Sequence, residues 1–427
     1  MCSINKPWLF RTSSIKDMKL VWKLFKHSTK DRKALVGAGV AMMATLNSGI
    51  RPNKESLVRE TTIALQCPVS MSTVGSVTFS FFWASPLVTP PHLAKPHSWS
   101  FGNGIGGHRG SGKNKIDHRQ LQLGENTPQS FLTAIDHGAS FIELGISNVQ
   151  LTKDLVPVVY HDFLLSETGT DTPMHDLSFE QFDYINQAQG PRWGRGKRSN
   201  SVGATDTSHL DALAERMAHT YFNRANGFKA NTRGSFIHEQ SCSLEDIFRA
   251  IGPTVPLNIE LKYPMLFETD EWDMELIAIK TDIFVDTVLN KVYEHAQGRT
   301  IVFSSFSPEI CIALSTKQRS YPVFFLSKTS APRGDLRACC IQQAIHFAKS
   351  WGLPGIVTEC TPFIRCPRLI GYVRSAGLAC STFGVLNSDP ACAKIQFDGG
   401  MNAVISDSVG ALMPIKRIGG SDVQVFP

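Results

Sequence analysis

The chain has 427 residues, of which 42% are hydrophobic and 19% are charged, and its formal net charge is +6. Such a composition is that of a globular protein with room for two or three domains and a large apolar core, which excludes a disordered chain and a small disulfide-stapled one. The net charge favours anionic small molecules but is too small to indicate nucleic-acid binding.

The first 99 residues are predicted to form an N-terminal segment of their own. Residues 1–33 are basic and lack a clear periodicity, and residues 34–46 are small and apolar, which fits either a helix or a buried strand. Residues 56–65 and 75–83 alternate apolar and polar side chains, which predicts two strands of a small β module. Several prolines then indicate a stiff linker before a second domain at residues 100–427; they are Pro86, Pro90, Pro91 and Pro96.

The sequence carries no targeting or membrane-spanning signal that we can identify. The N-terminus lacks the sustained apolar run of a secretory signal, and residues 77–88 are too few to cross a bilayer. The ten cysteines are scattered and include no C-x-x-C pair, which argues against a zinc site. We therefore expect reduced thiols, a cytoplasmic location and no stable membrane insertion.

From residue 104 onward, apolar strands alternate with amphipathic helices. The strands are expected to end near His108, Glu143, His161, Glu260, Ser305, Leu326, Thr358 and Phe383, with residues 402–407 as a further candidate. Helical patterns cover residues 244–250, 279–295, 308–315, 341–351, 366–376 and 391–397. This number of repeated units predicts the α/β class and a (β/α)8 TIM-type barrel. The turn at residues 152–155 is too short for a helix, so the barrel is predicted to be irregular there.

Residues 187–234 interrupt the strand–helix pattern with a stretch rich in glycine, arginine and serine. A basic lid over the barrel mouth, a phosphorylation site and a solvated insertion all fit this composition. The solvated insertion is favoured, because surface loops tolerate inserted residues.

Groups able to do chemistry stand where the predicted strands end. Residues 140–144 and 156–160 have the apolar character of buried parallel strands, and they lead to Glu143 and His161. His108 closes a further short apolar run. Because the carboxyl ends of parallel strands meet at one edge, we expect these side chains to share an active site.

The motifs around these groups resemble those of the glycerophosphodiester phosphodiesterase family. They are GHRG at residues 107–110, ENT at 125–127, FIEL at 141–144, VQLTKD at 149–154, PVVYHD at 157–162, NIELK at 258–262, SSF at 304–306 and G-L-x-C-x-T-F-G at 377–384. Each motif alone is weak, but together and in this order they are specific, and the family fold they imply is the same TIM-type barrel.

The segment before the barrel extends the resemblance. Residues 34–82 are similar to the stretch that precedes this domain in large fungal glycerophosphocholine phosphodiesterases. Those proteins carry SPX and ankyrin regions upstream, which have no counterpart in this sequence. The chain is therefore expected to be a truncated member or the product of an incomplete gene model.

The resemblance implies an acid–base pair and a phosphate-binding pair. His108 and His161 would shuttle protons, a task that suits histidine because its pKa lies near neutral. Arg109 and Lys262 would bind the phosphate, the arginine with its two-pronged fork of donors. Taken singly, each of these residues is more often structural, as a core histidine or as one half of a salt bridge.

The resemblance also implies a divalent cation, Ca²⁺ or Mg²⁺, held by carboxylates. Glu125, Glu143 and Glu260 would supply the hard oxygen ligands that these ions prefer. Without the resemblance, Glu125 is more simply a solvent-facing loop residue, and Glu143 and Glu260 are more simply partners in structural salt bridges. Glu260 and Lys262 stand two residues apart on one strand and so face the same side, where two charges need partners or a function.

One departure from the family pattern concerns the metal site. The family has E-x-D directly before VQLTKD, whereas here Glu143 and Leu144 are followed by residues 145–148 before Val149. Three residues are extra and the aspartate is absent. Counted back from Val149, Asn148 stands in its place as a neutral candidate ligand; counted forward from Glu143, Gly145 does, and it offers no side-chain ligand. A true bulge and a gene-model error would both produce this pattern, and the loss of a carboxylate lowers the affinity for a dication.

Three functions remain open from the sequence. The first is metal-dependent hydrolysis of glycerophosphodiesters, above all glycerophosphocholine, with a free small molecule as the partner and the oligomeric state undetermined. The second is a phosphodiester-binding or regulatory protein that has lost catalysis through residues 145–148, and metal affinity discriminates the two. The third is an aldolase-type lyase with a Schiff base on Lys262. Trp272 and Phe383 are candidates to face a quaternary ammonium, although such residues are more often core.

Overall fold

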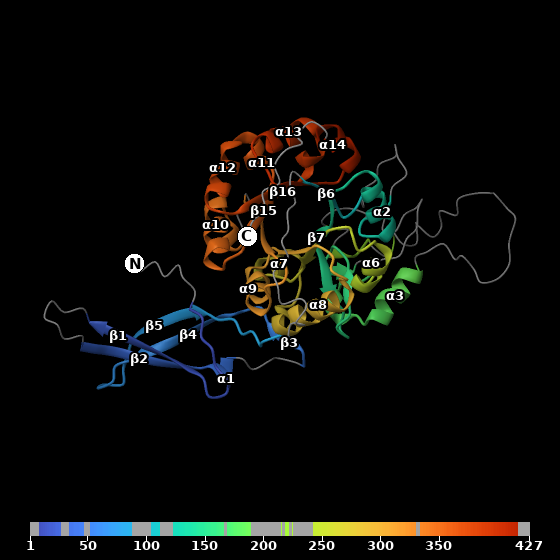
Figure 1. Ribbon diagram of the computed structural model, residues 1–427. Helices are drawn as coiled ribbons and strands as arrows, with labels where there is room; N and C mark the ends of the chain where they lie inside the picture. Colours follow the sequence, from blue (N-terminus) through green and yellow to red (C-terminus); the bar gives the residue numbers. More distant parts are fainter. Residues whose placement is uncertain are drawn as a thin grey trace. The chain divides into compact units, whose positions relative to one another are not determined.

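The structure is a computed structural model that describes residues 8–26, 34–46, 52–87, 104–111, 123–165, 169–188, 215, 218–221, 224, 242–329 and 334–416. The chain divides into two compact units. The first comprises Met1–Ser85 with Leu276–Asp282, and the second comprises Pro86–Glu275 with Ile283–Pro427. Figure 1 follows both units along the sequence from blue to red.

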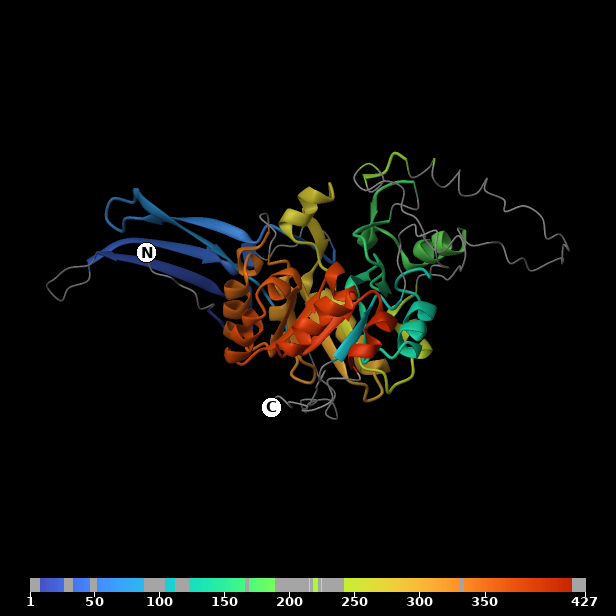
Figure 2. The ribbon, with the colours of Figure 1, turned by 90° about the horizontal axis from the view of Figure 1, so that it is seen from above.

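The first unit contains an antiparallel sheet, drawn in blue in Figure 2. Its order is β1 (Lys19–Lys26), β2 (Ala34–Met42), β4 (Glu60–Gln66) and β5 (Thr73–Ser80). The short helix α1 (Met43–Leu46) follows β2, and β3 (Lys54–Ser56) pairs antiparallel with β12 (Ile277–Ile279). A β-rich N-terminal segment, as predicted, is thus confirmed.

Strand β1 lies where the sequence shows no periodicity. Its residues Leu20, Val21 and Trp22 are apolar in succession, so both faces of the strand carry apolar side chains. Alternation, the usual sequence signal of a half-buried strand, is therefore absent.

The second unit contains a closed barrel, and the predicted (β/α)8 TIM-type fold is confirmed. In the described part of the chain, the ring has eight parallel strands and closes where β11 pairs with both β7 and β13. The strands are β6 (Gly104–His108), β7 (Phe141–Leu151), β11 (Leu257–Leu261), β13 (Ile301–Ser305), β14 (Val323–Ser327), β15 (Gly355–Glu359), β16 (Ala379–Phe383) and β17 (Ala403–Ser406).

Helices surround this ring, as Figure 1 shows for α10 to α14. The α-helices of the second unit are α2 (Pro128–Asp136), α3 (Phe179–Ala188), α6 (Leu244–Ala250), α7 (Leu266–Glu271), α8 (Thr281–His295), α9 (Pro308–Lys317), α10 (Ile341–Ser350), α11 (Thr361–Arg365), α12 (Arg368–Ser375), α13 (Pro390–Asp398) and α14 (Val409–Lys416). Short 3₁₀ turns are η3 (Met174–Asp176), η4 (Leu336–Ala338) and η5 (Val385–Ser388). Side chains cap several helix starts, among them Thr127, Ser243, Ser307 and Asp389, and the Ser307 cap lets α9 begin within a few residues of the end of β13.

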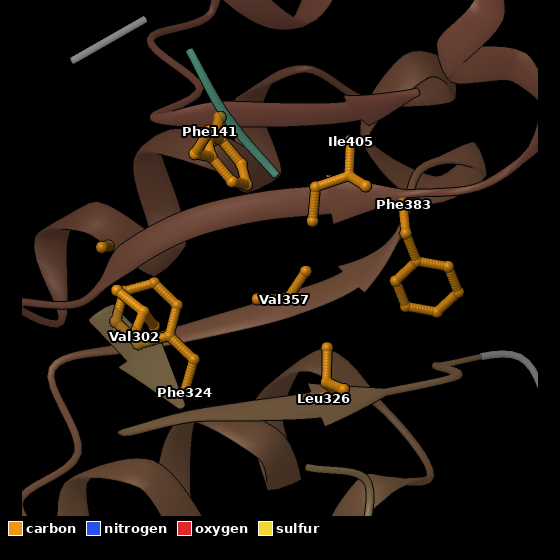
Figure 3. Packing of buried hydrophobic residues seen from close by; sticks show 9 residues of the cluster. Phe141, Val302, Phe324, Leu326, Val357, Phe383 and Ile405 are labelled. Carbon is orange, nitrogen blue, oxygen red and sulfur yellow. The ribbon is translucent and has the colours of Figure 1, made fainter. Parts of the chain in front are cut away.

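The barrel interior is a packed apolar core. Its buried members are Phe141, Val302, Phe324, Leu326, Val357, Ala379, Phe383, Ala403 and Ile405. Figure 3 shows their side chains pointing toward one another from neighbouring strands. Gly106 on β6 leaves the space that the Phe141 ring fills, because a Cβ at Gly106 would overlap that ring. Glu143, Glu260 and Lys262 lie beyond this core, toward the carboxyl ends of the strands.

The run at residues 156–160 was predicted to be a parallel barrel strand, and that prediction is wrong. Strand β8 (Pro157–Val159) pairs antiparallel with β7, and the eighth barrel strand is β17. The connection is a tight turn. The backbone N–H of Thr152 donates to the carbonyl of Val156, and the N–H of Val156 donates to the Thr152 hydroxyl. So short a turn can only join antiparallel strands, and it is the irregularity predicted at residues 152–155.

Strand β8 is apolar because it is buried outside the barrel. Val158 and Tyr160 belong to a second core cluster with Phe182 of α3. The chain then continues into a hairpin of β9 (Leu164–Leu165) and β10 (Thr172–Pro173). An apolar run of this length therefore does not distinguish a barrel strand from a strand packed beside it.

The extra residues of the departure form a bulge in β7. Leu144 lies opposite Ile259 of β11, and Val149 lies opposite Leu261. Five steps along β7 thus match two steps along β11, which is the excess of three residues counted from the sequence. The side chains of residues 145–148, including Asn148, lie outside the described residues.

Among the residues that the structure describes, no helix is both long and apolar enough to cross a membrane. The predicted insertion at residues 187–234 falls outside the described residues, apart from its first two residues and a few positions between 215 and 224.

The close packing of Gly106 on Phe141 can be tested by adding one methyl group. We expect Gly106→Ala to destabilise the barrel by about 1–3 kcal/mol, because the added Cβ overlaps a ring in a filled core. Gly371→Ala in helix α12 is the matched control: its Cβ meets nothing within 4 Å, and we expect it to be neutral or stabilising by up to about 1 kcal/mol. Urea unfolding followed by circular dichroism measures both, and equal stabilities would contradict the packing.

Candidate active site

The polar groups gather at the carboxyl ends of neighbouring barrel strands. His108 ends β6 and lies directly opposite Glu143 of β7. On the other side, Glu143 lies opposite Asn258 of β11. Glu260 stands two residues beyond Asn258 and so shares its face of the strand. The rim of the barrel therefore carries a histidine and two carboxylates on three adjacent strands.

His108 is oriented by a carboxylate from the last strand of the ring. Its Nδ1 is hydrogen-bonded to Asp407, the residue directly after β17, which pairs with β6. Burial lowers the pKa of His108, against the opposing effect of Asp407, and the charge of Arg109 lowers it further. The imidazole is therefore neutral, with Nδ1–H donating to Asp407. Its Nε2 is buried without a hydrogen-bond partner among the described residues.

Arg109 is fixed by its backbone as well as by its charge. The residue is left-handed, with φ of 53°, and its carbonyl accepts a hydrogen bond from Ser130 Oγ at 2.9 Å. Gly110, with φ of +81°, lets the chain pass against Ser130, whose backbone a Cβ would overlap. Nη1 of Arg109 donates to Glu125 Oε2 at 2.8 Å. Burial works to lower the pKa of Arg109, but the charge and hydrogen bond of Glu125, together with the charges of Asp162 and Asp407, raise that pKa above its ordinary value.

Glu143 is a fully buried carboxylate with one oxygen unmatched. Its Oε1 accepts a hydrogen bond from Asn258 Nδ2 at 3.2 Å, and Asn258 Oδ1 in turn accepts from Ser304 Oγ at 2.9 Å. Its Oε2 is buried without a partner among the described residues. Burial raises the pKa of Glu143 to about 8, although the charge of Arg109 opposes the shift. A bound cation would relieve this cost, so the site fits a metal ion.

Glu260 and Lys262 lie farther along β11 and are both buried. Burial lowers the pKa of Lys262, while the charges of Glu268 and Glu260 oppose the shift. Lys262 Nζ lies 3.8 Å from the centroid of the Phe163 ring, over its face. The ammonium is therefore held by an aromatic face and by neighbouring carboxylates.

His161 follows β8, away from the barrel strands, and still reaches the same site. Its Nδ1 lies 2.5 Å from Asp162 Oδ1. Gln150 holds this segment in place, since its Nε2 donates to the carbonyls of Tyr160 and Asp162 at 2.8 and 2.7 Å. Burial lowers the pKa of His161 to about 4, and the charge of Arg109 adds to the effect. The imidazole is thus neutral at ordinary pH.

The residues predicted from the sequence are brought together around one guanidinium. The charge of Arg109 shifts the pKa of His108, Glu143 and His161 alike, and Lys262 acts on His161 as well. Their catalytic roles stay predictions.

The metal-binding roles of Glu125, Glu143, Glu260 and Asn148 stay predictions. Glu125 faces Arg109, and within the described residues no three histidine, cysteine, aspartate or glutamate side chains are grouped closely enough to hold a metal ion. Asn148, the neutral candidate, lies outside the described side chains.

Asp407 is the site residue that the sequence reasoning missed. The candidate strand at residues 402–407 ends in this aspartate. An acidic residue at the end of an apolar run was the sequence signal that indicated Glu143, and Asp407 at the end of residues 402–407 shows the same signal. It was passed over because that strand was counted as an additional one.

The fold and the site together define the class: a TIM-barrel protein with acid–base and anion-binding groups at one mouth. A model of the Glycerophosphoryl diester phosphodiesterase family matches residues 108–411, and a GDE1-like C2 domain model matches residues 3–88. The chain belongs to the glycerophosphoryl diester phosphodiesterase family, and the resemblance inferred from the motifs is confirmed.

Two curated relatives match almost the whole chain. It is 38% identical over 418 residues to a protein of Eremothecium gossypii and 39% identical over 403 residues to one of Candida albicans, both named glycerophosphocholine phosphodiesterase GDE1. These matches cover 90% and 89% of this chain but 31% and 34% of the relatives. The chain therefore spans about a third of the length of these relatives.

A solved structure supports the fold alone. A putative glycerophosphoryl diester phosphodiesterase from Silicibacter pomeroyi superposes with a TM-score of 0.52 at 18% identity. The superposition covers 77% of this chain and 97% of that one.

The buried charge of Glu143 predicts how stability depends on pH. Its pKa rises from 4.5 to about 8 on folding, so the stability it contributes below pH 4.5 is lost as the pH rises toward 8. Without divalent cations, we expect Glu143→Gln to raise the melting temperature at pH 8 by at least about 2 °C and to change it little at pH 5. Thermal unfolding in a chelator measures this.

Glu359 offers the matched control on the same rim. Its carboxylate already accepts hydrogen bonds from Thr361, from the N–H at 3.0 Å and from Oγ1 at 2.7 Å. Glu359→Gln should therefore give no gain at pH 8. A higher melting temperature at pH 8 in both variants, or in neither, would contradict the assignment of an unmatched charge to Glu143.

Proposed function

We propose that this chain is a metal-dependent phosphodiesterase that hydrolyses glycerophosphodiesters, with glycerophosphocholine as the preferred substrate. The products are sn-glycerol 3-phosphate and choline. The observation that carries the proposal is a pair of carboxylate-bound histidines, His108 and His161, that both feel the charge of Arg109 at one barrel mouth. The names of the two fungal relatives support choline as the head group.

The phosphate group is bound by Arg109 and Lys262. Arg109 Nε is buried without a hydrogen-bond partner among the described residues, while Nη1 is taken by Glu125. This leaves guanidinium donors for a phosphate oxygen in the fork geometry that arginine favours. Lys262 adds a second positive charge from β11. Both cations neutralise the charge that develops on the non-bridging oxygens.

The two histidines move the protons. Each is neutral before substrate binds, and each has its Nδ1 on an aspartate: His108 on Asp407 and His161 on Asp162. The aspartates hold the rings in one tautomer and stabilise the imidazolium that forms during the reaction. A bound phosphodiester anion raises the pKa of both rings. One histidine then takes the proton of the attacking oxygen, and the other donates a proton to the leaving choline oxygen.

A divalent cation, Ca²⁺ or Mg²⁺, would be held by Glu143 and Glu260. The buried, unmatched Oε2 of Glu143 is the observation that fits such an ion. When bound, the ion supplies Lewis-acid polarisation of a phosphate oxygen. Glu125 is a further candidate ligand that also serves Arg109, and Asn148 remains a candidate from the bulge.

A binding protein with impaired catalysis is the second candidate function. The bulge in β7 replaces the position of the family aspartate, and the described residues contain no complete group of three metal-ligating side chains. Metal-dependent turnover separates the two functions. The match of residues 108–411 to the Glycerophosphoryl diester phosphodiesterase family argues against the aldolase-type alternative.

The acid–base pair is tested by removing each histidine in turn. We expect His108→Ala and His161→Ala to lower kcat for glycerophosphocholine by about 10²–10⁴, the usual loss of a general acid or base. Circular dichroism should show both variants folded. Turnover at the parent rate in both variants would show that the two histidines do not carry the proton transfers.

The bulge is tested by repair of the strand. Replacement of Gly145-Ile146-Ser147-Asn148 by a single Asp restores the family spacing and adds a carboxylate. Because ligand charge raises the affinity for a hard dication, we expect a lower metal concentration at half-maximal activity and a higher rate. Hydrolysis of glycerophosphocholine is measured against Ca²⁺ and Mg²⁺ for both chains. Identical metal dependence would contradict the role given to the missing aspartate, and no activity in either would favour the binding protein.

A further inference from the structure

Three aromatic rings form a row beside the phosphate-binding lysine. Lys262 Nζ lies over the face of Phe163, 3.8 Å from the ring centroid. The Phe163 ring meets Trp272 in a T-shaped contact with centroids 6.0 Å apart. Trp272 meets Tyr221 with centroids 6.2 Å apart. The row thus leads from the proposed phosphate site outward to two rings that are only partly buried.

The rings come from three separate parts of the second unit. Phe163 follows the His161–Asp162 pair directly, and Trp272 is the residue after helix α7, which itself follows β11. Tyr221 belongs to the stretch at residues 187–234 that the sequence predicted to be an insertion. Its backbone N–H donates to Asp171 Oδ2 at 2.5 Å, which ties it to the segment before β10. A residue of the insertion therefore lies beside an element of the active site.

The burial of the rings distinguishes their roles. Phe163 is 2% exposed and its face is already taken by Lys262, so it serves as packing. Trp272 and Tyr221 retain exposed surface. Aromatic faces attract cations, and they are a recurring means of binding quaternary ammonium groups, which cannot donate hydrogen bonds to carboxylates.

The negative phosphate and the positive trimethylammonium of glycerophosphocholine follow one another in the same order as Lys262 and the outer aromatic rings. In a glycerophosphocholine the trimethylammonium is joined to the phosphate by two carbon atoms and an oxygen. With the phosphate on Lys262 and Arg109, the head group extends from the phosphate, and the indole lies one ring beyond Lys262. A neutral head group of similar size would find the same space without the electrostatic attraction.

We propose that Trp272 and Tyr221 form the recess for the trimethylammonium of the substrate and set the preference for choline over neutral head groups. Phe163 positions Trp272, and Asp171 positions Tyr221. The inference rests on the proposed function, since it names specificity residues for that reaction. It also assigns to the insertion a contribution to substrate recognition.

The test compares two substrates that differ only in the head group. Glycerophosphocholine and glycerophosphoglycerol share the glycerol and the phosphate, and only the first carries a cation. We expect Trp272→Leu and Tyr221→Leu each to lower kcat/KM for glycerophosphocholine about fivefold to twentyfold, mainly through KM. The same variants should change kcat/KM for glycerophosphoglycerol by less than about twofold, since no cation–π contact is lost. Trp272→Phe, which keeps an aromatic face, should retain most of the preference.

Trp351 provides a matched control. Like Trp272 it is the residue directly after a helix and is partly buried, but helix α10 leads into the amino end of β15, at the opposite end of the barrel. Trp351→Leu should leave the ratio of the two kcat/KM values at the parent value. Activity on glycerophosphoglycerol reports at the same time that each variant is folded.

The outcomes separate this inference from the proposed function. An equal loss on both substrates, or no loss on either, overturns the recess while the phosphodiesterase stands. If the parent hydrolyses neither substrate with Ca²⁺ or Mg²⁺, the proposed function is overturned. Calorimetric titration with glycerophosphocholine then tests the proposed trimethylammonium recess. If Trp272→Leu binds glycerophosphocholine more weakly than the parent does, the recess is supported, and equal affinity overturns it.

Discussion

The positive charge of Arg109 is the interaction on which the arrangement of the barrel mouth depends. Its side chain is buried and bonded to Glu125, its left-handed backbone is held by Ser130, and its charge reaches both histidines and Glu143. A guanidinium that stays protonated under all ordinary conditions lowers the pKa of nearby imidazoles and partly offsets the burial of a carboxylate. The Arg109 guanidinium therefore anchors the structure of the mouth and is also the proposed hydrogen-bond donor to the substrate phosphate.

The second constraint is the number of charges buried without full compensation. Glu143 has one unmatched oxygen, and Lys262 rests on an aromatic face. Burying such groups costs free energy of folding. That cost is understandable if the mouth is built for an anion and a cation that arrive from solution, since each would relieve a charge of the opposite sign. The bulge in β7 lies beside this site, so the balance of carboxylates there decides between an active enzyme and a binding protein.

Much of the fold followed from local patterns. The alternation of apolar strands and amphipathic helices predicted the barrel, and the residues at the strand ends predicted His108, Glu143 and Glu260 as rim residues. The prediction was wrong where one local sequence pattern is compatible with two different structures. An apolar run of five residues fits a barrel strand and also β8, which is buried against α3. Strand β1, with apolar residues on both faces, showed no alternation to detect.

By itself, the amino-acid sequence determined which chemical groups the protein owns, the strand ends at which most of them stand, and the three extra residues after Leu144. Those properties are local, because they depend on residue order, periodicity and motif spacing. Only the tertiary structure decided that Asp407 orients His108 across 299 residues of chain, that His161 arrives on an antiparallel strand, and that Tyr221 packs on Trp272. It also decided the pKa values of the site. The physical reason is that burial and the approach of distant charges arise from closing the barrel, and no local pattern in the chain encodes them.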